Sequence, residues 1–258
     1  MTDFEIFRAC FPGYSLTEEL FEKLLEKDKC TAFRKEGGMA FVRGNKIALI
    51  AVAPPFQKKG TGKTLLEQCE SYLSSEGQEY IYAGGFFPGL PENCRGYFEK
   101  NGYETQGGRV EMGMDLRDFS VRNPALPDVS FAFFNGDHSE LIKAVREVDE
   151  EWVQYFTHDS TVFCGYKDGK PVSFCIVDET VDCLLSDGKS KVGSIGCVGT
   201  VPAFRRQGTG LCMVEIATEF LKNKGCDKSF IHCTHLEKWY GKLGYRTFLR
   251  YCAARKKI

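Results

Sequence analysis

The sequence lacks the features that send a chain to a membrane, to nucleic acid or out of the cell. Its 258 residues carry a net charge of −1 at pH 7, so no overall electric field draws the chain to nucleic acid or to acidic membranes. No apolar run approaches the ~20 residues that a membrane-spanning helix needs. The first ten residues, MTDFEIFRAC, are not a signal peptide. We therefore expect a cytoplasmic protein that binds neither membranes nor nucleic acid.

The sequence also lacks paired cysteines, although it contains twelve cysteines. No C-x-x-C motif occurs, and most of the cysteines stand singly within apolar runs. This pattern is typical of buried free thiols in a reducing compartment. The segment HCTH at 232–235 could suggest a metal site, but adjacent side chains of a strand point to opposite faces and no second cluster of ligands occurs. We therefore predict no metal.

A stretch of 25 residues occurs twice in the chain. It reads VPAFRRQGTGLCMVEIATEFLKNKG at 201–225 and APPFQKKGTGKTLLEQCESYLSSEG at 53–77. In both copies the last glycine of the Gly-Thr-Gly loop lies fifteen positions before the glycine that ends the stretch. The offset of about 148 residues exceeds the repeat length of solenoid proteins. We therefore predict two related domains, residues 1–120 and 128–258, joined by a polar, proline-containing segment.

Each copy has the same physical design. A run of small and β-branched residues ends at a proline, which predicts the end of a strand. A glycine-containing loop and an amphipathic helix closed by a glycine follow. Such a loop directs unpaired amide groups and the positive end of the helix dipole at one point, so it suits an anion and above all a phosphate.

The remaining pattern predicts that each half is a mixed α/β domain, α+β-like, with a mixed sheet. The first half should contain a helix over 15–27, two or three short strands within 30–52, a strand over 80–83, a short helix over 97–101 and a hairpin over 103–115 that turns at Gly107-Gly108. The second should contain a helix over 137–152, a hairpin over 162–178, an additional strand near 181–186 and strands over 194–201 and 229–234.

A nucleotide-binding loop is one alternative for the first copy. Gly62-Lys63-Thr64 matches the end of the P-loop motif G-x-x-x-x-G-K-[ST]. The first glycine of that motif would be residue 57, which is glutamine, and the second copy has Leu211-Cys212 in place of lysine and serine or threonine. ATP or GTP binding is therefore the weakest of the functions that we consider.

Both copies fit a different motif, [QR]-x-x-G-x-[GA], between a strand and a helix. The matching segments are Gln57–Gly62 and Arg205–Gly210. This arrangement resembles the coenzyme A pyrophosphate loop of the GNAT superfamily of N-acetyltransferases. One such hexapeptide is a weak signal, but two copies in the same strand–helix context are a strong one, and the resemblance extends over most of both halves. It implies two tandem GNAT-type domains with acetyl-CoA as co-substrate.

The resemblance implies a set of coenzyme contacts in each half. The strand backbone would pair with the pantetheine arm, and the loop amides would bind the pyrophosphate, with basic loop side chains in support. In the C-terminal half these residues are Val198, Gly199, Thr200, Arg206, Gln207, Gly208, Thr209, Gly210 and Leu211. In the N-terminal half they are Ile50, Ala51, Val52, Lys58, Lys59, Gly60, Thr61, Gly62 and Lys63.

The resemblance also implies a catalytic tyrosine in the C-terminal half. Transfer of an acyl group from a thioester to an amine requires a proton for the departing thiolate. GNAT enzymes commonly take it from the tyrosine of [FWL]-Y-x-x-x-G-[FY], and the segment Trp239–Tyr245 fits this pattern, which makes Tyr240 the general acid. The first half has Phe98 at this position, and Tyr97 lies about 100° away round a helix. We therefore predict a catalytic C-terminal domain and a degenerate N-terminal domain that can still hold an acyl-CoA.

The general base and the acceptor stay open at this point. The acidic and imidazole side chains that could border the site are Asp159, Asp178, Glu179, His232 and Glu237. The leading hypothesis is an acetyl-CoA-dependent N-acetyltransferase acting on a small-molecule amine or a peptide amine. The alternative is a non-catalytic module that binds or senses acyl-CoA. The sequence indicates no oligomeric state.

Overall fold

The computed structural model describes residues 1–258 except 28, 85–89 and 123–125. The described strands form one mixed sheet of twelve strands, in the order β1-β2-β3-β4-β12-β6-β11-β10-β9-β8-β7, with β5 paired to β12. The elements of the first half are α1 (Asp3–Cys10), α2 (Glu18–Lys27), β1 (Thr31–Lys35), β2 (Gly38–Arg43), β3 (Lys46–Val52), α3 (Thr61–Ser75), β4 (Tyr80–Ala83), β5 (Leu90–Pro91), α4 (Arg95–Lys100) and β6 (Glu104–Asp115). Those of the second are β7 (Ser130–Phe133), α5 (His138–Val148), β8 (Val162–Lys167), β9 (Lys170–Asp178), β10 (Val192–Thr200), α6 (Thr209–Asn223), β11 (Lys228–Thr234), α7 (Glu237–Gly241) and β12 (Arg246–Lys257).

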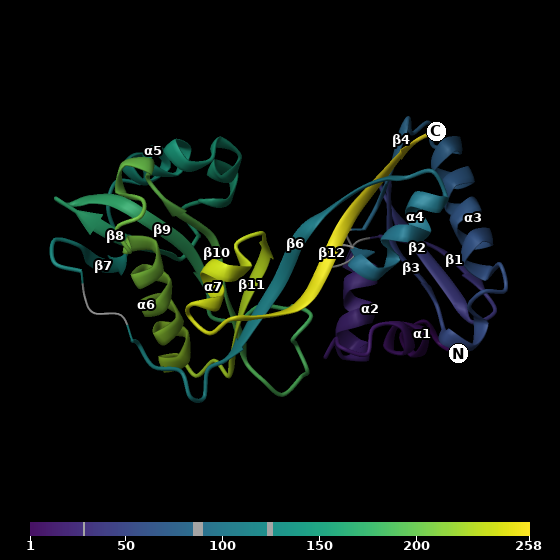
Figure 1. The fold of residues 1–258 in the computed structure, drawn as a ribbon, viewed down its shortest axis with the longest axis horizontal. Helices are drawn as coiled ribbons and strands as arrows, with labels where there is room; N and C mark the ends of the chain where they lie inside the picture. The colour runs from purple at the N-terminus through teal and green to yellow at the C-terminus, as the bar shows by residue number, and fades with distance from the viewer. Residues whose placement is uncertain (28, 85–89, 123–125) are drawn as a thin grey trace.

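The last strand of each half lies in the sheet of the other half. β12 runs between β4 and β6, where Ala254 pairs with Ala83 on one side and with Thr105 on the other. β6 in turn pairs with β11, where Asp115 lies opposite Lys228. Figure 1 shows β12 and β6 side by side between the halves, with the C-terminus beside the helices of the N-terminal half. The two halves therefore share one continuous hydrogen-bonded sheet.

The predicted hairpin over 103–115 is wrong, because these residues form the single long strand β6. The two glycines lie instead at a bulge, where the register against β12 shifts between the pairs Tyr251–Arg109 and Ala253–Gln106. Gly108 has a φ of +97°, which a residue with a side chain rarely adopts. The strand does not turn back because β12, from the far end of the chain, supplies its partner.

Other expectations also fail. The helix predicted over 137–152 ends at Val148 as α5, and α1, β5 and β7 were not predicted. The residues near 181–186 form a loop rather than a strand, with the hydroxyl of Ser186 accepting a hydrogen bond from the amide of Cys183 (2.9 Å). Helix α2 begins at Glu18 rather than at residue 15. The hydroxyl of Thr17, just before the helix, accepts a hydrogen bond from the amide of Leu20 (3.3 Å). The mixed α/β class, the three strands within 30–52 and the hairpin of β8 and β9 are as expected.

Helices cover both faces of the sheet in each half. α3 packs on β2 and β3, and α6 packs on β9 and β10, while α1 and α5 lie on the opposite face. Each long helix buries apolar side chains: Leu65, Leu66, Cys69 and Leu73 in α3, and Met213, Val214, Ala217 and Leu221 among others in α6. All twelve cysteines are free. In the described part of the chain, no helix combines the length and apolar character needed to cross a membrane.

The packing of α6 on β10 makes a testable prediction at Gly193. A methyl group there would lie 2.7 Å from Leu221 and 3.0 Å from the carbonyl oxygen of Asp178, so Gly193→Ala should lower the free energy of unfolding by about 1–3 kcal/mol. The control is Gly196→Ala on the same strand, which meets no atom within 4 Å and should change stability by less than about 0.5 kcal/mol. Urea denaturation measures both, and equal effects would contradict the packing.

Candidate active site

The two Gly-Thr-Gly loops have the same backbone conformation. Lys58 and Arg206 have φ angles of +61° and +63°, and Gly60 and Gly208 have φ angles of +88° and +87°. Each of these glycines is the N-cap residue of its long helix, and neither helix has a side-chain cap. The repeat in the sequence is therefore also a repeat of the local structure.

The loops expose a row of amide groups. In the described part of the chain, the amides of residues 58–63 and 206–211 have no hydrogen-bond acceptor, and the first bonds of the helical ladder come at Thr64 and Cys212. These groups lie at the positive end of a fifteen-residue helix in each half. The local geometry in each half thus suits a phosphate group.

The first residue of each motif holds its loop in place. Nε of Arg205 donates to the carbonyl oxygen of Thr200 (2.9 Å), and Nε2 of Gln57 donates to that of Val52 (2.8 Å). Both bonds span five residues and link the loop to the last residue of the preceding strand. Both side chains donate an N–H, which explains why either arginine or glutamine serves at this position. The Arg205 side chain therefore binds backbone.

The strand before each loop diverges from its parallel neighbour. The pairing of β10 with β11 ends at Ser194 and Phe230, and that of β3 with β4 ends at Ile47 and Ala83. β10 also contains a bulge at Cys197, whose φ is +48°, while it stays paired with β9 on its other side. In the described part of the chain, no further backbone pair joins either strand to its parallel neighbour beyond these positions.

A cavity of about 620 Å³ adjoins the second loop. It brings together nearly all the residues that the sequence selected in this half, which come from β10, the loop, the start of α6 and α7. Of those residues Val198, Gly199, Thr200, Arg206, Gly208, Thr209, Gly210, Leu211 and Tyr240 line it. Gln207 does not; its side-chain amide donates to the carbonyl oxygen of Ala203 (3.2 Å).

Tyr240 is buried at the wall of this cavity. Its hydroxyl has no hydrogen-bond partner among the described residues, whereas the nearby Tyr245 hydroxyl is bonded to Thr218 (2.9 Å) and Ser229 (2.7 Å). Burial raises the pKa of Tyr240, with Tyr245 and two neighbouring thiols adding to the rise. The phenol is therefore protonated at neutral pH and its proton is not committed to another side chain.

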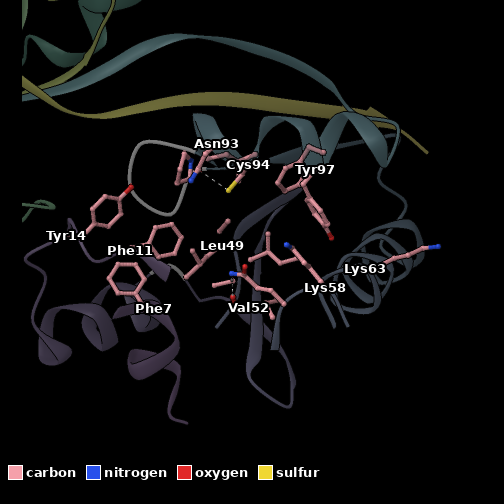
Figure 2. A pocket seen from close by; sticks show the side chains of 18 of the residues that line it. Phe7, Phe11, Tyr14, Leu49, Val52, Lys58, Lys63, Asn93, Cys94 and Tyr97 are labelled. Atoms are coloured by element: carbon pink, nitrogen blue, oxygen red, sulfur yellow. Dashed lines mark hydrogen bonds between the residues drawn. The ribbon is translucent and has the colours of Figure 1, made fainter. Parts of the chain in front are cut away.

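The first half contains a corresponding cavity of about 540 Å³. Figure 2 shows Lys58 and Tyr97 at one end, Phe7, Phe11 and Tyr14 at the other, and Leu49 between them. Of the residues that the sequence selected in this half, Ile50, Ala51, Val52, Lys58, Gly60, Gly62 and Lys63 line it. Lys59 and Thr61 are not among its lining residues.

The aromatic pair on α4 differs from that on α7. Tyr97 lies beside Gly62, its hydroxyl 3.5 Å from where a Cβ on that glycine would stand, just as Trp239 lies 3.6 Å from the same point at Gly210. Phe98, which is buried in the cavity wall, therefore has the place that Tyr240 has in the second half. The N-terminal cavity thus has no hydroxyl at that position.

Three of the candidate general bases contact other side chains. The carboxylate of Asp178 accepts from Ser194, Glu179 pairs with Lys224, and Glu237 accepts from Thr247. His232 is bonded instead to the fully buried Glu111, which the sequence analysis missed. The only sequence signal for Glu111 was an acidic residue among the apolar residues of β6. The described residues contain no cluster of three or more His, Cys, Asp or Glu that could hold a metal ion.

The N-terminal cavity makes a testable prediction at Tyr97. Among the residues that the structure describes, its buried hydroxyl has no hydrogen-bond partner, and burial raises the pKa of Tyr97 to about 12. Tyr97→Phe should therefore raise the free energy of unfolding by about 1 kcal/mol. The matched control is Tyr103→Phe, which deletes a hydrogen bond to Glu70 (2.9 Å) and should lower it by about 1–2 kcal/mol. A loss of stability in Tyr97→Phe would contradict this geometry.

The sequence matches the model of one protein family twice. The family is described as the acetyltransferase (GNAT) family, and the matches cover residues 4–103 and 128–245. Each match ends just before the last strand of its half, β6 or β12. No curated protein matches the chain significantly.

Solved structures share the whole fold at low sequence identity. The glucosamine N-acetyltransferase region of a fungal multi-domain β-N-acetylglucosaminidase matches with a TM-score of 0.77 and 20% identity, over 97% of this chain and 36% of that one. A GCN5-related N-acetyltransferase from Sphaerobacter thermophilus matches with 0.71 and 16%, over 98% and 90%. A tandem GNAT protein from the clavulanic acid biosynthesis pathway matches with 0.60 and 11%, over 99% and 96%. The chain belongs to the acetyltransferase (GNAT) family, as an acyltransferase with two tandem copies of the domain.

Proposed function

We propose that the C-terminal half transfers the acetyl group of acetyl-CoA to a primary amine. The observation that carries this proposal is the cavity of about 620 Å³, which has free loop amides at one end and the Tyr240 hydroxyl at its wall. An acyl carrier with a diphosphate at one end and a thioester at the other needs both features. Membership of the GNAT family supports acetyl-CoA as that carrier.

The coenzyme would lie along β10 and across the start of α6. Its pyrophosphate would accept hydrogen bonds from the amides of 206–211, and its pantetheine arm would pair with the backbone edge at 198–200. The residues fit such a group, because these amides have no acceptor in the described part of the chain. The bonds from Arg205 and Gln207 to the backbone keep the loop in the conformation that exposes them.

Tyr240 would then act as the general acid. When the bond between the acyl carbon and sulfur breaks, the thiolate needs a proton, and the phenol of Tyr240 carries one at neutral pH because burial raises its pKa. The attacking amine must lose a proton, since an alkylamine with a pKa of about 10.4 is mostly protonated at pH 7. The proposed acceptor is therefore an amine that is in its neutral form when it attacks the thioester.

The N-terminal half is proposed to hold an acyl-CoA without turning it over. Its loop has the same conformation and the same free amides, and its strand diverges in the same way. Phe98 offers no proton where Tyr240 does. This half is the basis of the second candidate function, a module that binds or senses acyl-CoA.

A substitution at Tyr240 tests the general acid. Tyr240→Phe should lower kcat for thiol release by about 10²-fold while the Kd for acetyl-CoA stays within about twofold. The assay follows thiol release from acetyl-CoA with a panel of amines that includes glucosamine, the acceptor named for the fungal relative. The control is Tyr245→Phe, which removes a buried hydroxyl bonded to Thr218 and Ser229 and should leave kcat unchanged. A full rate in Tyr240→Phe would rule out the acid role.

Charge reversals in the two loops test the number of coenzyme sites. Arg206 and Lys58 hold equivalent positions with nearly equal φ angles. Calorimetry should give two acetyl-CoA molecules per chain, and Arg206→Glu or Lys58→Glu should each weaken one site by about tenfold or more, because a carboxylate then faces the diphosphate. Only Arg206→Glu should affect turnover.

Binding without thiol release for any amine would favour the sensing module, and stabilisation by ATP with magnesium but not by coenzyme A would favour a nucleotide site.

A further inference from the structure

A second, smaller cavity lies where β10 and β11 begin to diverge. It has a volume of about 330 Å³. Its walls are residues 194–196 of β10, Phe230 and His232 of β11, and the loop over 181–184. Phe230 packs with Cys183 and Val192, whereas Ile231, which points the other way, belongs to the core beneath α6. The cavity therefore opens on the face of the sheet opposite α6, next to the end of the strand segment proposed for the pantetheine arm.

His232 is the imidazole in this cavity, and a carboxylate from the other half holds it. A carboxylate oxygen of Glu111 lies 3.1 Å from Nδ1 of His232. Glu111 is on β6, the last strand of the N-terminal half, and its side chain is fully buried, while 59% of the His232 side chain is exposed. The dyad exists only because β6 pairs with β11.

A backbone contact fixes the Glu111 carboxylate. The register of β11 against β6 shifts between Ile231 and Thr234, and Cys233 in the resulting bulge has a φ of +53°. The amide of Cys233 donates to Oε1 of Glu111 (3.0 Å). The carboxylate thus accepts a hydrogen bond from the amide in the bulge and also faces the imidazole ring.

The carboxylate determines which nitrogen of His232 carries the proton. The carboxylate acts as an acceptor, as its bond from the amide of Cys233 shows, so Nδ1, which faces it, donates. In the neutral ring the lone pair is then on Nε2, the nitrogen that does not face Glu111. A neutral imidazole in this tautomer can take a proton from a group in the cavity.

We propose that His232 is the general base of the C-terminal site, with Glu111 as its positioning residue and the smaller cavity as the place of the acceptor amine. This rests on the proposed acetyl transfer. The nitrogen of a neutral primary amine forms a bond to the acetyl carbon, and the bond from that carbon to sulfur breaks. Nε2 of His232 takes a proton from the amine while Tyr240 gives its proton to the thiolate. Solvent then removes the proton from His232 and returns one to Tyr240, which leaves an acetamide and free coenzyme A.

Other ionisable groups surround the dyad. Arg109, also on β6, donates to the carbonyl oxygen of Cys233 (3.3 Å), and the buried Tyr251 of β12 has its pKa raised by burial and by the neighbouring Cys233 and Glu111. Tyr14 has its pKa raised by burial, with Glu111 adding to the rise. The loop side of the cavity carries Asp182, which pairs with Lys23 (3.3 Å). Because these groups are also ionisable, the pH–rate profile of each variant is measured against that of the wild type.

Two substitutions test the dyad through different atoms. His232→Asn removes the base, and Glu111→Gln keeps the shape but presents an N–H₂ donor to Nδ1, which stabilises the wrong tautomer. Each should lower kcat for thiol release from acetyl-CoA by about 10²-fold, with amines or with water as acceptor, and should flatten the acid limb of the pH–rate profile. The double variant should lose no more than either single one, because both act through one imidazole. Acetyl-CoA affinity should not change.

Matched controls and a spectroscopic measurement separate a catalytic from a structural role. His158→Asn and Glu104→Gln remove an exposed histidine and an exposed carboxylate of β6 that line neither cavity of this half, and they should leave kcat unchanged. Nitrogen-15 NMR of His232 should show the Nδ1–H tautomer in the wild type and the Nε2–H tautomer in Glu111→Gln.

The outcomes distinguish this proposal from the one on which it rests. Turnover by the wild type with unchanged rates and pH profiles in His232→Asn and Glu111→Gln would overturn the dyad and leave the acetyl transfer standing. No thiol release by the wild type would overturn both. A loss of rate in Glu111→Gln without a change of tautomer would overturn the positioning role of Glu111.

Discussion

The pairing of β6 with β12 is the contact on which the rest of the structure depends. These two twelve-residue strands lie in the middle of the sheet, and each is the last strand of its half. The backbone groups at a strand edge need hydrogen-bond partners. In this chain, the last strand of each half pairs with a strand of the other half. The halves therefore cannot separate without breaking backbone hydrogen bonds, and they hold a fixed position relative to each other.

That fixed position lets one half complete the chemistry of the other. Glu111 is fully buried, and burying a carboxylate is costly unless hydrogen bonds compensate for the lost water. The amide of Cys233 and the ring of His232, both on β11, supply them. A residue of the first half is thus held beside the opening between β10 and β11, where the proposed thioester and amine would meet.

The two halves differ most where the proposed chemistry needs a proton. Their loops agree within a few degrees, and the side chain of Arg205 or Gln57 fixes each loop in the same way. At one position on the short helix, however, the second half has Tyr240 and the first has Phe98. The shared geometry accounts for binding an anion in both halves, and the single hydroxyl is the basis for proposing transfer in only one.

The sequence by itself determined the local features, because they depend on neighbours along the chain. The glycines and the proline of each repeat predicted the loop and helix, and the resemblance to the GNAT motif selected Tyr240, which lines the same cavity as the second loop. Only the tertiary structure decided the path of β6, since its partner β12 lies more than a hundred residues away and the Gly107-Gly108 pair suits a turn as well as a bulge. The same long-range pairing decided the surroundings of His232: no local pattern can reveal that a glutamate from the other half faces it.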